Sequence, residues 1–122
     1  MLADLPGSFS WIMVEDYLDG PAMLCGANGI VTGLSNVWAE YHVGLVRAAQ
    51  VGNREGVAKN HALIHELYGI HRVTGGKGIP ALKAGAAFLG RSTRWMKMAS
   101  LTVGEEDAAR VRGVLESMHL LE

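Results

Sequence analysis

Only two stretches of this 122-residue sequence have the β-branched and aromatic composition of buried strands, and both lie in its first third. Residues 9–14 read FSWIMV and residues 29–34 read GIVTGL, and a short helical stretch is expected between them at 17–25. This order predicts two parallel strands joined by a crossover. Because two parallel strands alone leave two unpaired edges, the chain is expected to be a piece of something larger or to have a partner that covers them.

The remainder of the sequence has the periodicity of consecutive helices. Ser35 or Asn36 can cap the first of these helices, and Gly90 is a suitable stop for the third. The expected helices run from about residue 36 to 52, from 54 to 71, from 80 to 89, and from 105 onwards. The predicted fold class is therefore α/β, with mostly helical content.

Composition excludes several classes of function. The net charge is −1 with acidic and basic residues interspersed, which gives no basic stripe for nucleic acid and no polybasic patch for a membrane. No apolar run reaches the roughly 18 residues of a membrane span, and the opening MLADLP lacks the regions of a signal peptide. A single cysteine, Cys25, excludes an internal disulfide and fits a reducing, cytoplasmic compartment.

Several short motifs occur in the order found in one enzyme family. Residues 26–36, GANGIVTGLSN, resemble the last barrel strand of the dihydrodipicolinate synthase/N-acetylneuraminate lyase family, and residues 9–16 resemble its seventh strand. Further similar segments are AAQVGN at 48–53, IPALK at 79–83 with the LG at 89–90, and residues 115–121. The resemblance implies the C-terminal part of a (β/α)8 TIM barrel. Residues 1–51 would supply its last strand–helix units, and residues 52–122 a C-terminal helical region.

The resemblance also implies a chemistry. Family members are class I aldolases, in which a barrel lysine forms a Schiff base with pyruvate. Asp16 matches an acidic position of the substrate pocket, while Thr32 and Gly33 match a strand end that borders the pyruvate carboxylate. The family's Schiff-base lysine and catalytic tyrosine would precede Met1, and none of the four lysines present ends a predicted strand. The resemblance thus implies a carbon–carbon lyase segment that is inactive alone, whose parent uses pyruvate or another 2-oxo acid.

Two departures from the family pattern bear on this interpretation. Val14 stands where the family keeps a glycine, and residues 94–100 lack both prolines of the corresponding family segment. An alternative is a non-catalytic, self-associating helical module derived from the same family. The first interpretation predicts that activity needs further sequence, and the alternative predicts stable oligomers. The expected partner is a second copy in a homo-oligomer or a chain that supplies the rest of the barrel. A third and less favoured one is a small enzyme or metal protein with newly recruited residues.

The third interpretation depends on His61 and His65, which stand at i and i+4 as two metal ligands on one helix face would. The zinc-protease order requires a glutamate after the first histidine, but Ala62 follows His61. Histidines on a polar face are therefore the default interpretation, and no metal and no cofactor are expected. Residues 75–78, GGKG, are expected to form a surface loop because Gly78 replaces the Ser/Thr of a phosphate loop.

Other side chains have ordinary structural interpretations. Because neighbouring strand residues point to opposite faces, only one of Glu15 and Asp16 can enter a pocket. Asp16 is favoured, with a solvated strand end as the alternative. Cys25 is expected to be a buried, unreactive thiol. The side chains expected to pack in the core or against a barrel or subunit are Tyr41, Tyr68, Trp95, Met96, Met98 and Met118.

Overall fold

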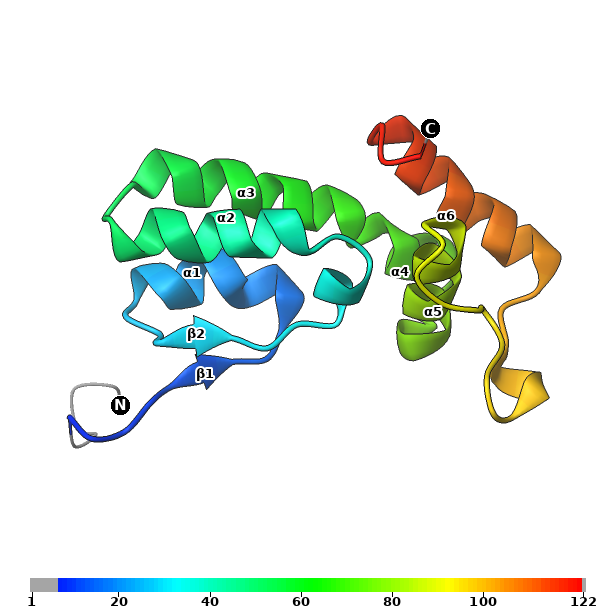
Figure 1. The fold of residues 1–122 in the computed structure, drawn as a ribbon, viewed down its shortest axis with the longest axis horizontal. Coiled ribbons are helices and arrows are strands. Elements are labelled where there is room, and N and C mark those ends of the chain that lie inside the picture. Colours follow the sequence, from blue (N-terminus) through cyan, green and yellow to red (C-terminus); the bar gives the residue numbers. More distant parts are fainter. Residues whose placement is uncertain (1–6, 122) are drawn as a thin grey trace.

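The computed structural model describes residues 7–121, and its first elements form a parallel strand–helix–strand unit (Figure 1). Strand β1 (Ile12–Met13) pairs with β2 (Gly29–Ile30), and α1 (Asp19–Leu24) connects them after the single 3-10 turn η2 (Asp16–Leu18). The predicted topology is confirmed. Both strands are shorter than predicted, because within residues 7–121 each has only one neighbour with which to form a ladder.

Helices make up most of the remaining chain, which confirms the predicted helical content. They are η3 (Leu34–Asn36), α2 (Ala39–Gln50), α3 (Arg54–Leu67), α4 (Gly69–Val73), α5 (Gly78–Phe88), η4 (Ala99–Leu101) and α6 (Glu105–Ser117). The predicted start of a helix at Ser35 or Asn36 is wrong. The Asn36 side chain donates to the Gly33 carbonyl (3.0 Å), which holds a separate 3-10 turn before α2. The helix predicted over 54–71 is interrupted at Tyr68, ahead of a glycine.

The elements form two groups around a continuous apolar core. In Figure 1, α1 lies between the strand pair and the α2–α3 hairpin, while α4, α5 and α6 gather at the other end. Fully buried side chains run through both groups and include Leu34, Leu45, Ile64, Leu67, Ile70, Val111 and Leu115. No helix in the part of the chain that the structure describes is long and apolar enough to cross a membrane.

The backbones of α2 and α3 approach closely at two glycines. A Cβ atom on Gly44 would lie 2.5 Å from Asn60 Oδ1, and one on Gly56 would lie 2.9 Å from Ala48 Cβ. Asn53 caps α3 by accepting a hydrogen bond from Gly56 N (2.9 Å). Each helix therefore has a glycine where its partner presents a side chain.

Three surface features bear on the sequence predictions. Cys25 is exposed at the end of α1 rather than buried, because the chain turns there at Gly26 with a φ of 95°. Trp95 and Met98 are about three-fifths exposed in the loop before α6, so neither is packed in the core as expected, and the Arg94 guanidinium lies over the Trp95 ring. The GGKG segment is a loop, as predicted, with Lys77 Nζ 2.6 Å from Asp107 Oδ2.

Candidate functional site

Asp16 joins the ends of the two strands. It follows β1 and is 7% exposed, and its Oδ1 accepts a hydrogen bond from Leu34 N (3.3 Å), which lies beyond β2. A Cβ atom on Gly33 would lie 3.6 Å from Asp16 Oδ2. The structure thus brings Asp16 and Gly33 together, as parallel strand ends do. The alternative of a solvated strand end is wrong for Asp16, whereas Glu15 beside it is exposed.

The three residues singled out by the resemblance line three different hollows. Thr32 lies in a groove of about 650 Å³ between β2 and α2, and its hydroxyl accepts a hydrogen bond from Ser35 N (3.2 Å). Gly33 borders a second hollow beside α5. Asp16 lines a smaller one of about 260 Å³ together with Tyr68 and His71. These residues therefore mark the strand ends without forming one enclosed cavity among residues 7–121.

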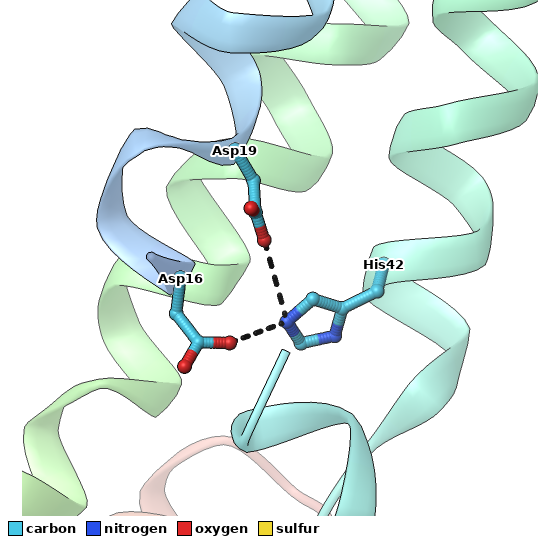
Figure 2. Close-up of side chains that lie close together, drawn as sticks. All are labelled: Asp16, Asp19 and His42. Atoms are coloured by element: carbon cyan, nitrogen blue, oxygen red, sulfur yellow. Dashed lines mark ion pairs between the residues drawn. The ribbon is translucent and has the colours of Figure 1, made fainter. Parts of the chain in front are cut away.

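Asp16 belongs to a buried cluster of two carboxylates and an imidazole (Figure 2). Asp16 comes from η2, Asp19 begins α1, and His42 is on the inner face of α2. His42 Nε2 lies 3.3 Å from Asp16 Oδ1 and 4.0 Å from Asp19 Oδ2. Figure 2 shows both carboxylates directed at this one ring nitrogen. Asp19 is completely buried, and His42 is 4% exposed.

The other ring nitrogen of His42 fixes the tautomer. His42 Nδ1 lies 3.2 Å from the Trp38 carbonyl oxygen. Because a carbonyl oxygen only accepts hydrogen bonds, Nδ1 carries the hydrogen, and in a neutral ring Nε2 is then an unprotonated lone pair. In the neutral ring this lone pair faces two carboxylates, and in the protonated ring the same nitrogen carries a hydrogen directed at them.

Asp19 is the most strongly perturbed acid of the cluster. Neither of its carboxylate oxygens has a hydrogen-bond partner among the described residues, and the same is true of His42 Nε2. Burial, together with the charge of Asp16 and against the opposing effect of His42, raises the pKa of Asp19 from 3.8 to about 7. The site therefore favours a state in which a positive charge or a proton lies among the three side chains.

Sequence reasoning identified Asp16 but missed Asp19 and His42. The available signal was weak: two aspartates three residues apart after a strand, and a histidine on a helix face that also carries the buried Leu45. The pair His61 and His65, which has the spacing of two metal ligands, has structural roles. His61 Nδ1 accepts a hydrogen bond from Gly20 N (3.3 Å), and His65 Nε2 lies 3.1 Å from the Tyr17 carbonyl oxygen. Both rings thus hold the α3 helix against the η2–α1 segment.

In residues 7–121, which contain all four lysines, no lysine lies at a strand end, as predicted. Lys59 is on α3, and Lys77 precedes α5 and pairs with Asp107. Lys83 Nζ donates to the Trp95 carbonyl (2.6 Å), and Lys97 lies in the loop before η4. A nucleophilic lysine of the Schiff-base type requires a desolvated ammonium beside a substrate carbonyl. Lys83 lines the same hollow as Gly33, but its ammonium is bonded to the Trp95 carbonyl, and the other three lysines line neither that hollow nor the one beside Asp16.

The described residues form a mostly helical fold with one parallel β–α–β unit, and a buried carboxylate lies at the ends of its two strands. No family model matches the chain. It is 28% identical over 108 residues to 4-hydroxy-tetrahydrodipicolinate synthase of Anaeromyxobacter dehalogenans, covering 88% of this chain and 36% of that protein. The corresponding protein of Anaeromyxobacter sp. strain K is 27% identical over the same length.

Solved structures show the same relationship. Dihydrodipicolinate synthase from Aquifex aeolicus superposes with a TM-score of 0.84 at 26% identity, covering 98% of this chain and 40% of that one. The fold of the enzyme from Bacteroides thetaiotaomicron matches with a TM-score of 0.84 at 22% identity. The chain is therefore homologous to dihydrodipicolinate synthase over most of its length. It spans 36% of the length of the Anaeromyxobacter dehalogenans protein.

Proposed function

We propose that this chain is the C-terminal segment of a Schiff-base carbon–carbon lyase acting on pyruvate, and that it is not catalytic by itself. Residues 1–51 would supply the last strand–helix units of a (β/α)8 barrel, and residues 52–122 the helical region after it. The observation that carries the proposal is a parallel strand pair with both outer edges unpaired in residues 7–121 and no lysine at either strand end. Homology to dihydrodipicolinate synthase supplies the reaction class.

Asp16, Thr32 and Gly33 have distinct parts in this proposal. Active sites of α/β barrels lie at the carboxyl ends of the strands. Asp16 fixes the relative position of the two strand ends because its carboxylate accepts a hydrogen bond from Leu34 N. Gly33 has no side chain, so nothing projects from the backbone beside this carboxylate. The Thr32 hydroxyl lies at the end of β2, where a neighbouring strand–helix unit would complete the wall. The chain thus supplies the wall of a pyruvate site, and the nucleophile comes from a different segment or chain.

Reductive trapping tests the proposal. The folded 122-residue chain is incubated with pyruvate and borohydride and then analysed by intact mass. The expected result is an unchanged mass, because no lysine follows a strand and Lys83, which lines the hollow beside Gly33, has its ammonium bonded to the Trp95 carbonyl. A complete dihydrodipicolinate synthase in a parallel tube is the positive control. A covalent adduct that maps to one lysine of this chain would overturn the proposal.

Self-association is a second candidate function, favoured by exposed apolar side chains along the open strand edges. Val14 and Val31 are 69% and 61% exposed, and Ile12 and Val43 are each about two-fifths exposed. Val31 and Val43 also line the open groove between β2 and α2. An uncovered strand edge beside an apolar groove favours pairing with another chain. The proposed occupant is a second copy of this chain.

A lysine on the open edge should weaken that association. Val31→Lys places a charge on the groove and is expected to raise the dimer dissociation constant by about tenfold or more, since edge charges oppose pairing. Val51→Lys is the matched control, because Val51 is 79% exposed at the end of α2 and outside the groove. Sedimentation velocity over a concentration series measures both. A monomer at every concentration, or equal weakening by both variants, would contradict self-association through this edge.

A further inference from the structure

We propose that Asp16, Asp19 and His42 bind one divalent first-row transition-metal ion of the zinc, cobalt or manganese class. The inference rests on the buried cluster alone and is independent of the proposed lyase ancestry. The site is formed by side chains from η2, α1 and α2 (Figure 2).

The donor atoms have spacings that suit a shared ion. One oxygen from each aspartate and His42 Nε2 all lie within 4.8 Å of one another. Ligands held about 2.0–2.2 Å from one zinc ion are separated by roughly 3–3.5 Å. The 3.3 Å between Asp16 Oδ1 and His42 Nε2 already has this value, and the 4.0 Å to Asp19 Oδ2 requires only a small inward shift.

His42 is oriented as a metal ligand. Metal-binding histidines usually donate their second ring N–H to a carbonyl or carboxylate, which leaves the other nitrogen free to coordinate. His42 Nδ1 has the Trp38 carbonyl oxygen as its partner, so the free nitrogen is Nε2, the one directed at the carboxylates. The Asp16 carboxylate is likewise oriented by Leu34 N.

Charge and burial indicate a cation. Two carboxylates facing an imidazole lone pair, all nearly removed from water, repel one another unless something positive lies between them. The Asp19 oxygens and His42 Nε2 have no hydrogen-bond partner in residues 7–121, and a protonated His42 would supply only one positive charge for two carboxylates. A divalent ion neutralises two carboxylates and uses these unpartnered atoms as ligands. His42 also borders the open β2–α2 groove, which offers the ion a route inward.

The donor set selects the class of ion. One imidazole nitrogen with two carboxylate oxygens suits zinc, cobalt and manganese, whereas calcium and magnesium favour oxygen ligands alone. An ion bound by three ligands from η2, α1 and α2 would link the crossover segment between the two strands to the α2 helix that follows them. The ion should therefore stabilise the fold.

Metal titration of the whole chain tests the site. The chain is stripped with a chelator, dialysed and titrated with Zn²⁺, Mn²⁺ or Co²⁺, followed by calorimetry, thermal unfolding and the visible absorption of bound Co²⁺. We expect one equivalent per chain and a rise in Tm of roughly 10 °C at a free-ion concentration about a hundred times Kd. Binding of Mg²⁺ or Ca²⁺ with no response to Zn²⁺ or Co²⁺ would overturn the assignment.

Variants separate this site from adventitious binding. His42→Gln and Asp19→Asn should each weaken binding by at least about 30-fold and abolish the Tm shift, since each removes one of three ligands. Asp19→Asn keeps the shape of the neutral carboxylic acid, so it should fold even if His42→Gln does not. His119→Gln is the control, because His119 is exposed beyond α6 and should bind the ion as the parent does. Absence of saturable binding, or binding that survives Asp19→Asn, would overturn the proposal.

Discussion

Replacing Leu45 with alanine is expected to lower the free energy of unfolding by about 2–5 kcal/mol. Leu45 is fully buried on α2 and belongs to the same apolar cluster as Ile64 of α3. The substitution removes buried methyl groups and leaves a cavity that packed neighbours fill only in part. Urea unfolding followed by circular dichroism measures the change.

Val43→Ala on the same helix is the matched control for Leu45→Ala. Val43 is 44% exposed, so the free energy of unfolding should change much less, by about 0.5 kcal/mol. Equal losses for the two variants would show that the two faces of α2 are equally buried in solution. An assembly that covers the β2–α2 groove would produce that result, and sedimentation would reveal it.

In metal-free, chelator-containing buffer, Asp19→Asn is expected to stabilise the chain above pH 7 by on the order of a few kcal/mol. The folded-state pKa of Asp19, about 7, lies above its ordinary value of 3.8. The folded protein therefore holds this proton more tightly than the unfolded chain does. The corresponding stability is complete below about pH 4 and is lost as the pH rises through 7. The asparagine variant has no charge at position 19 at any pH and avoids that loss.

The pH profile distinguishes this effect from a general gain in stability. Parent and Asp19→Asn should have similar free energies of unfolding near pH 4 and should diverge as the pH approaches 7. Asp107→Asn is the control and should show no such gain, since its ion pair with Lys77 lowers the pKa of Asp107. A difference between Asp19→Asn and the parent that is constant with pH would show that Asp19 is not the titrating group.

Local signals predicted the helical half of the fold well. The run of acids at residues 105–107 opens α6, and α5 ends just before Gly90, which has a φ of 69°. These signals act through the backbone of their own helix, so the sequence contains them directly. Strand lengths and the start of α2 were predicted poorly. Ladder length depends on partner strands, and the Asn36 side chain bonds to the Gly33 carbonyl instead of capping α2.

Prediction of the site was limited by distance along the chain. Asp16 could be identified because it directly follows a predicted strand. Asp19 and His42 belong to different helices, and only the packing of α1 against α2 brings His42 Nε2 to the carboxylates. Their burial is what makes them chemically unusual, and burial of a particular polar side chain has no local signature in one sequence. The exposed Cys25 was mispredicted for the same reason.

The two glycines at the α2–α3 contact have a consequence for recombination between related chains. Gly44 faces Asn60 and Gly56 faces Ala48, so the close packing of the two helices depends on the absence of a Cβ atom at both glycines. A chimera whose junction falls in the turn between the two helices would take α2 from one parent and α3 from the other. Each glycine would then face a side chain from the other parent, and a larger side chain there would push the two backbones apart. Junctions placed before α2 or after α3 leave both contacts intact. The hairpin is therefore the smallest unit that can be exchanged whole.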